Sequence, residues 1–136
     1  MQELLEAALA GAGADGIEGV DVVVRAALGA SVSDVLSADG FLLGTPANIG
    51  YMSGALKHFF DTVYYPTLTA KIGAPYSAYV HGNNDTAGAI RGIETITKGL
   101  GWQCVHEPVT VIGAVTRQDT EAVWELAATT AAALSS

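Results

Sequence analysis

A loop rich in glycine and proline, between an apolar run and a helical pattern, is the segment best suited to chemistry. It reads Gly-Thr-Pro-Ala-Asn-Ile-Gly-Tyr-Met-Ser-Gly-Ala-Leu-Lys over residues 44–57 and follows the apolar run Asp39–Gly44. In open α/β sheets, ligands bind in crevices beyond the carboxyl ends of the strands. The glycines let the backbone approach a ligand, and the N–H groups between Ala47 and Met52 can point at its polar edge. An ordinary strand-to-helix turn has the same composition, so the glycines alone leave both interpretations open.

A second polar loop follows the next apolar run, Tyr76–Val80. It reads His-Gly-Asn-Asn-Asp-Thr-Ala-Gly over residues 81–88 and leads into a helical pattern. Because parallel strands end at the same edge of a sheet, we expect the two loops to converge there and form a flat pocket. His81 is either a ligand contact or a polar residue that caps the turn, and Asn83 and Asn84 equally suit the cap of the following helix.

Taken as a whole, the segment Asp39–Asp61 resembles the flavin-contacting segment of flavodoxin-like proteins, especially the NADPH-dependent flavin reductases and the quinone reductases. The residues that carry the resemblance are Gly44-Thr45-Pro46, Gly50, Gly54-Ala55-Leu56-Lys57 and Phe59-Phe60-Asp61. The resemblance implies an α/β fold, a flavodoxin-like three-layer sandwich with a parallel sheet. We expect residues 1–136 to form a single domain of this kind.

The resemblance also implies FMN as the cofactor. The first loop would lie against the dimethylbenzene–pyrimidine body of the flavin, with either Ile49 or Tyr51 on its flat face. An aromatic ring is the better stacking partner. Polar groups of the second loop would meet the pyrimidine edge and stabilise the negative charge of the reduced ring. The expected cofactor contacts are Thr45, Pro46, Ala47, Asn48, Ile49, Gly50, Tyr51, His81, Gly82, Asn83 and Asn84.

By the same resemblance, the protein would pass hydride or electrons from NAD(P)H to a flavin or quinone acceptor. The flavin carries the redox chemistry, so no protein side chain is expected to act as acid or base. Met52–Val63 and Tyr64–Pro66 would form the interface of a homodimer or homotetramer. The alternative is a binding or scaffold domain that kept the fold and lost the cofactor.

Strand patterns that alternate with helical patterns support a parallel sheet covered on both faces. Helices are expected over residues 2–10, with Gly11 and Gly13 closing the first, and over Ser31–Leu36, Met52–Val63, residues 85–98 with Asn84 or Asp85 as the cap, and residues 120–134. Strands are expected over Val20–Ala27, Asp39–Gly44, Tyr76–Val80 and Trp102–Ile112, the last interrupted at Pro108. The apolar run Asp39–Gly44 indicates a strand buried on both faces.

Composition excludes several classes of function. The chain has 136 residues, of which 50% are apolar and 15% charged, so it can bury a hydrophobic core. Fourteen acidic and six basic residues give a net charge of −8, which disfavours a nucleic-acid partner. The single cysteine excludes an internal disulfide and disfavours a cysteine-based zinc site, and no metal is expected. There is no long apolar run and no leader pattern, so we expect no membrane span and a cytoplasmic location.

The sequence departs from the flavodoxin-like pattern at its start. That fold begins with a strand and a phosphate-binding loop, whereas this sequence opens in a helix and shows no such loop. The absent strand would be central, in the order 2-1-3-4-5, and would leave Val20–Ala27 separated from Asp39–Gly44 by a strand-wide gap. Three explanations compete: the true start lies upstream, the sheet rearranges to four strands and buries its edge in a dimer, or the chain is a poorly folding fragment. We favour an upstream start, because Leu4–Leu9 reads as a complete first helix.

Overall fold

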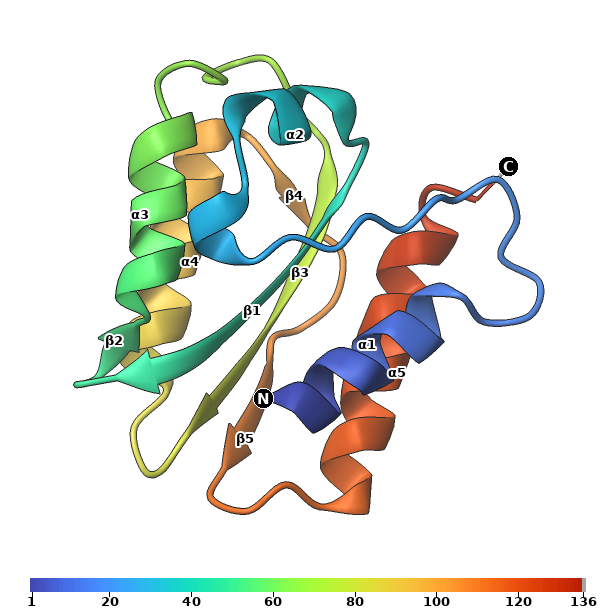
Figure 1. The fold of residues 1–136 in the computed structure, drawn as a ribbon, viewed down its shortest axis with the longest axis vertical. Coiled ribbons are helices and arrows are strands. Elements are labelled where there is room, and N and C mark those ends of the chain that lie inside the picture. The colour runs from blue at the N-terminus through green and yellow to red at the C-terminus, as the bar shows by residue number, and fades with distance from the viewer. Residues whose placement is uncertain (136) are drawn as a thin grey trace.

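Helices cover both faces of a mostly parallel sheet in the computed structural model, which describes residues 1–135 (Figure 1). The helices are α1 (Gln2–Ala12), α2 (Val32–Ser37), α3 (Gly54–Val63), α4 (Ala87–Leu100) and α5 (Arg117–Ala132), with a 3-10 turn η1 (Ala27–Gly29). The strands are β1 (Phe41–Asn48), β2 (Tyr51–Met52), β3 (Pro75–Gly82), β4 (Gln103–Cys104) and β5 (Val109–Ile112). This is the three-layer α/β arrangement that the sequence predicts. Among residues 1–135, no helix combines the length and apolar character needed to cross a bilayer.

Strand β3 lies at the centre of the sheet. Along one edge it pairs in parallel with β1, from Phe41 opposite Tyr76 to Pro46 opposite His81. Along the other edge it pairs in parallel with two short strands in turn, first β4 and then β5. The two are separated at Val105–Pro108, so the predicted interruption at the proline is confirmed. Strand β2 pairs only with the end of β1, as the return strand of a hairpin.

Two apolar clusters form the core, one on each face of the sheet. On the α3 and α4 face, the Phe41 ring stacks on Trp102 with centroids 3.9 Å apart and planes 8° from parallel. On the α1 and α5 face, Leu4, Val123 and Leu126 are fully inaccessible to solvent. Each such side chain contributes about 1.5–3 kcal/mol relative to an exposed position.

Helix ends depend on local caps. Ser31 and Asp34 form a capping box at the start of α2. The N–H of Ser31 donates to the Asp34 carboxylate and lowers the pKa of that group. A second capping box, at Thr116, caps α5, which begins at Arg117, three residues earlier than expected. Helix α3 begins at Gly54 rather than at Met52, because the Ser53 side chain accepts the N–H of Leu56.

The prediction of a strand at Val20–Ala27 is wrong. The segment is extended but unpaired, and Val22, Val23 and Val24 are 43%, 65% and 48% exposed. Ile17 and Val20 pack with the α1 and α5 cluster, while Ala27 packs with the α3 cluster, so the segment crosses from one face to the other (Figure 1). β-branched residues favour a strand only where a neighbouring strand supplies the ladder.

Strand β1 also differs from expectation. It was expected to be buried on both faces, but Gly44 is exposed and Phe41 and Leu42 are only half-buried. In the described part of the chain, Phe41–Pro46 pairs with β3 alone, so the other edge of β1 has no strand beside it. An edge position leaves part of each side chain accessible, whereas an inner parallel strand is covered by neighbours on both sides.

Helices α1 and α5 cross closely at Gly11, so this glycine lies inside α1 instead of ending it. A Cβ atom at Gly11 would overlap the backbone carbonyl of Trp124. The helix continues to Ala12, and Gly13 is its C-cap. The absence of a side chain therefore sets the distance between the two helices, which pack on the same face of the sheet.

We expect Gly11→Ala to lower the free energy of unfolding by about 2 kcal/mol, because overpacking forces α1 away from α5. Urea denaturation followed by circular dichroism measures the change. Gly54→Ala is the matched control, since it also adds a methyl group to a helical glycine but meets nothing within 4 Å. Equal stability of the two variants would contradict the close packing at Gly11.

Candidate functional site

The carboxyl ends of three strands meet at one rim of the sheet. Pro46 of β1 lies opposite His81 of β3. A Cβ atom at Gly82 would lie 3.1 Å from the Cβ of Ala47. The N–H of Gly113, after β5, donates to the Gly82 carbonyl over 2.8 Å. The two polar loops are therefore adjacent, as the sequence predicts, and a third loop at Gly113 completes the rim.

The first loop is a tight β-hairpin instead of a turn that begins at Gly44. Strand β1 continues to Asn48, which pairs with Tyr51 across a two-residue connection. Both residues of this connection have positive φ angles, +50° at Ile49 and +72° at Gly50. Two-residue hairpins require this geometry because it matches the twist of the flanking strands. Glycine adopts it without cost, whereas a β-branched residue there is strained by about 1–2 kcal/mol.

Ile49 is also fully exposed. The hairpin thus holds an apolar side chain at its tip in an unfavourable backbone conformation, with no protein contact that compensates. Strain of this kind is concentrated at binding and active sites. Ile49 is accordingly the strongest single indication of a ligand at this rim.

Thr45 holds the hairpin to the start of α3. Its side chain is completely buried, donates a hydrogen bond to the Pro46 carbonyl over 2.8 Å, and accepts the N–H of Ser53 over 3.0 Å. Ser53 in turn caps α3. The Thr45 hydroxyl therefore makes both of its hydrogen bonds within the protein, and these bonds stabilise the loop.

The hairpin packs against two glycines of α4, Gly88 and Gly92. This contact was not predicted from the sequence. A Cβ atom at Gly88 would overlap the Gly50 carbonyl, and one at Gly92 would lie 2.6 Å from the Tyr51 ring. Their spacing of four residues places both on one face of the helix. A pair of glycines four apart inside a helix is the sequence signal that points to such a contact.

The second loop begins with a fixed histidine. The His81 ring is half-buried, and its Nε2 lies 2.6 Å from the Gly113 carbonyl oxygen. A carbonyl oxygen only accepts, so Nε2 is the donor in this hydrogen bond. His81 therefore ties the second loop to the third.

The helix after this loop is capped differently from the prediction. Asn83 and Asn84 are exposed, and the Asn84 side chain accepts the N–H of Asp85 over 2.7 Å. The cap residue of α4 is Thr86, which makes no side-chain cap bond. Asp85 still satisfies one free N–H, because its carboxylate accepts from Ala87 over 3.0 Å.

The predicted contact residues divide into two groups. Thr45 and Gly82 are buried and support the loops. The half-buried or exposed residues that reach the surface of the rim are Pro46, Ala47, Asn48, Ile49, Gly50, Tyr51, His81, Asn83 and Asn84. The rim therefore offers a small apolar surface beside polar groups, which suits a flat heteroaromatic ring with a polar edge.

Helix α1 carries an acidic residue near its start. It begins at Gln2, and Glu3 lies in its first turn. A carboxylate at a helix start competes with an anionic ligand for the N–H groups there. A phosphate group at this helix start would therefore compete with Glu3.

Lys57 and Asp61, two charged residues of the segment that resembles the family, pair with each other. The lysine ammonium donates to the Asp61 carboxylate over 2.6 Å, one turn along α3, and this hydrogen bond raises the pKa of Lys57. Both side chains are exposed, so the pair contributes little to stability.

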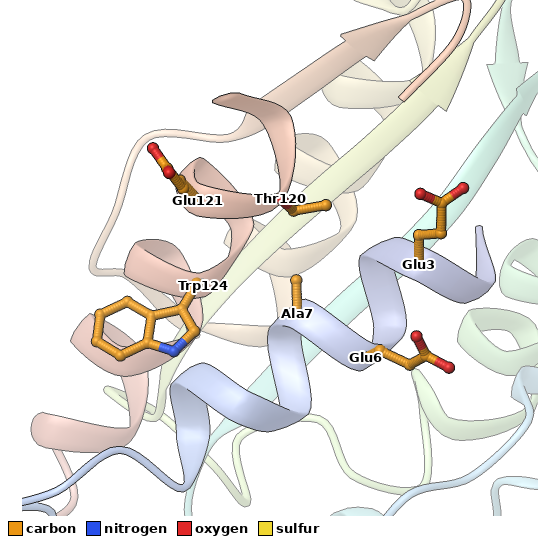
Figure 2. Close-up of a pocket in the computed structure, with 6 residues that line it drawn as sticks. All are labelled: Glu3, Glu6, Ala7, Thr120, Glu121 and Trp124. Carbon is orange, nitrogen blue, oxygen red and sulfur yellow. The ribbon is translucent and has the colours of Figure 1, made fainter. Parts of the chain in front are cut away.

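A separate groove runs between α1 and α5 (Figure 2). Its lining residues are Glu3, Glu6, Ala7, Thr120, Glu121 and Trp124. None of them belongs to the rim, and the groove lies on the opposite face of the sheet from α4, against which the hairpin packs. Three carboxylates make the groove unsuitable for an anionic cofactor.

Comparison with known proteins agrees with this geometry. Residues 8–116 match the family model described as NADPH-dependent FMN reductase. The chain is 36% identical over 75 residues to a flavodoxin from Aquifex aeolicus (strain VF5), a match that covers 53% of this chain and 40% of that protein. The chain's match thus spans less than half the length of this relative.

Solved structures of flavodoxins share the fold. The flavodoxin, WrbA-like protein from Agrobacterium tumefaciens superimposes with a TM-score of 0.78 at 18% identity, over 99% of this chain and 90% of that one. For the flavodoxin of Streptococcus pneumonia TIGR4 the TM-score is 0.79 at 20% identity, over 97% and 90%. Rubredoxin oxygen:oxidoreductase from Desulfovibrio gigas gives 0.76 at 19% identity, over 98% of this chain and 33% of that protein.

These structural likenesses establish the fold, and the family model adds the sequence evidence across both rim loops. The chain belongs to the NADPH-dependent FMN reductase family, a flavodoxin-like family of FMN-binding flavoproteins.

Proposed function

We propose that this chain binds the isoalloxazine ring of FMN at the rim, between the β1–β2 hairpin and the loop of residues 81–84. The loaded protein then passes hydride or electrons from NAD(P)H to a flavin or quinone acceptor. The observation that carries the proposal is the convergence of the two loops, with the strained and fully exposed Ile49 at the tip of the first. Family membership supports the choice of cofactor.

The protein's part in this chemistry is to hold and orient the ring. FMN, when bound, supplies the redox chemistry itself. Ile49 and Tyr51 provide the apolar surface on which the ring rests, and the close fit of Gly50 on Gly88 keeps that surface rigid. The bond from His81 to Gly113 holds the second loop in place, so that its N–H groups and amide side chains face the polar edge of the ring.

A non-catalytic binding or scaffold role is the second candidate. The observation in its favour is the Thr45 hydroxyl, which is buried and makes both of its hydrogen bonds within the protein. The two functions differ in a simple property, because only the first requires that a flavin bind.

We expect riboflavin to bind at least as tightly as FMN, because the ring supplies the affinity and the phosphate meets a chain with a net charge of −8. Quenching of flavin fluorescence during titration of the purified protein measures both dissociation constants. If FMN binds roughly tenfold more tightly, a difference of about 1.4 kcal/mol, a phosphate site exists and this expectation is wrong. If neither flavin binds, the scaffold role replaces the redox role.

We expect Ile49→Asn to raise stability and weaken flavin binding at the same time. Asn before Gly50 suits a two-residue hairpin, so relief of the strain adds about 1 kcal/mol to the free energy of unfolding. Loss of the apolar contact weakens riboflavin binding by about tenfold. Thermal unfolding and the fluorescence titration measure the two effects.

Ile72→Asn is the matched control. Ile72 is 69% exposed and is not among the residues with positive φ, so the same substitution there changes neither quantity. Because the Ile49 variant is expected to be more stable than the wild type, weaker binding cannot be ascribed to unfolding. Unchanged riboflavin affinity would place the ring elsewhere.

Anaerobic mixing with NADPH tests the redox step. We expect the flavin-loaded protein to lose its oxidised-flavin absorbance faster than free FMN at the same concentration, because bound flavin is oriented toward the donor. Ile49→Asn, measured at a flavin concentration that saturates it, should lose part of this acceleration. A rate equal to that of free FMN would remove the oxidoreductase assignment and leave flavin binding intact.

A further inference from the structure

Arg91, in the second turn of α4, is a basic side chain that the flavin ring site does not use. It is exposed, and within residues 1–135 its side chain makes no ion pair and no hydrogen bond. Lys57, which lies close enough to Tyr51 to interact with it electrostatically, is held by Asp61. The chain has only six basic residues against fourteen acidic ones, so a free guanidinium is one of its few places suited to an anionic ligand.

The Arg91 guanidinium lies beside the tip of the β1–β2 hairpin. A Cβ atom at Gly88 would overlap the Gly50 carbonyl, and the same Cβ atom would lie 3.8 Å from a terminal nitrogen of Arg91. Side chains on a helix point back toward its N-terminus, so Arg91 extends over the turn that contains Gly88. Because Gly88 has no side chain, nothing at that position separates the guanidinium from the hairpin.

The hairpin tip therefore has an apolar group and a cationic group next to each other. Ile49, which precedes Gly50, is fully exposed. A ligand with a flat ring and a phosphate group can contact both residues. The nicotinamide donor is such a ligand, because its nicotinamide must lie against the flavin ring to transfer hydride, while its phosphate groups extend past the edge of that ring. An exposed guanidinium at the edge also suits a ligand that must leave after each reaction.

We propose that Arg91 binds a phosphate group of the nicotinamide dinucleotide that reduces the flavin. The proposal rests on the proposed function, and it names the residue that recognises the donor. The group is either the 2′-phosphate, which only NADPH carries, or the pyrophosphate, which NADPH and NADH share. The chemistry is the same in both cases, since a guanidinium donates two parallel N–H bonds to phosphate oxygens. Arg91 takes no part in the hydride transfer itself.

One carboxylate lies near this position. The Oδ2 atom of Asp85 would be 3.7 Å from a Cβ atom at Gly50, and its Oδ1 atom accepts the N–H of Ala87. Within residues 1–135, no ion pair joins Asp85 to Arg91, so the five N–H donors of the guanidinium remain available. The negative charge of Asp85 repels a phosphate group. This repulsion weakens the contact and favours a donor that exchanges.

Isothermal titration of NADP⁺ and NAD⁺ into the riboflavin-loaded protein tests the proposal without any reaction. Riboflavin has no phosphate, so the only phosphate groups in the titration are those of the dinucleotide. We expect Arg91→Gln to weaken NADP⁺ binding about tenfold, because it removes a charge-assisted contact. Arg91→Lys should keep part of the affinity, since it keeps the charge and loses the two parallel bonds.

Lys98→Gln is the matched control. It removes the same charge from an exposed residue of the same helix, in the last turn of α4 and thus far from the hairpin. We expect it to leave the affinity for both dinucleotides unchanged, because exposed charges at that distance are screened by salt. Circular dichroism checks that each variant is folded, and fluorescence titration checks that each binds riboflavin as the wild type does.

The two dinucleotides identify the phosphate group. If Arg91 contacts the 2′-phosphate, Arg91→Gln weakens NADP⁺ binding alone and brings it to the level of NAD⁺. If Arg91 contacts the pyrophosphate, the variant weakens both by the same factor. Either pattern supports the proposal. The rate of flavin reduction by NADPH and NADH, measured at donor concentrations well below saturation, should fall in the same pattern.

Several results would overturn the proposal. They are dinucleotide affinities that Arg91→Gln leaves unchanged, equal weakening by Lys98→Gln, and a riboflavin-loaded wild type that binds neither dinucleotide. A variant that binds FMN more weakly but both dinucleotides as before would assign the guanidinium to the flavin's own phosphate, and the proposal would be wrong. These results leave riboflavin binding intact, whereas a wild type that binds no riboflavin would remove the proposed function together with this inference.

Discussion

The parallel ladder between β1 and β3 is the interaction on which the rest of the structure depends. Its register runs from Phe41 opposite Tyr76 to Pro46 opposite His81, so both strands end at the same level. Two loops that lie far apart in the sequence are thereby brought together without any direct bond between their side chains. The apolar clusters on the two faces stabilise this ladder, and the ladder in turn fixes the positions of the two loops.

Close backbone contact between the rim loops and their neighbours depends on glycines, which have no side chain. Gly88 and Gly92 let the hairpin lie directly on α4, and Gly82 leaves room for Ala47. Ile49 reverses this pattern, because a bulky residue occupies a position that favours glycine or asparagine. The loop is thus closely packed where it touches the protein and strained at its exposed tip, a combination that is common at binding sites.

The open edge of β1 affects a different part of the molecule. With no strand beside Phe41–Pro46, Val20–Arg25 is left extended and unpaired on the surface. Unpaired strand edges favour association, and proteins usually cover or charge them. Val20 packs in the apolar cluster on one face and Ala27 in the cluster on the other, which holds the segment extended between them.

The sequence by itself determined the features that depend on nearest neighbours. The helices α2 and α3 and the break at Pro108 follow from local hydrogen bonds or periodicity, and the sequence predicts all three. The convergence of the two loops was also predicted, since it follows from a parallel sheet. Only the tertiary structure decided that Val20–Ala27 is not a strand, because a strand exists only with a neighbour that supplies its ladder. It also decided the extent of the hairpin and the role of Gly88, since both depend on how closely α4 approaches β1 and β2, a distance that no local pattern encodes.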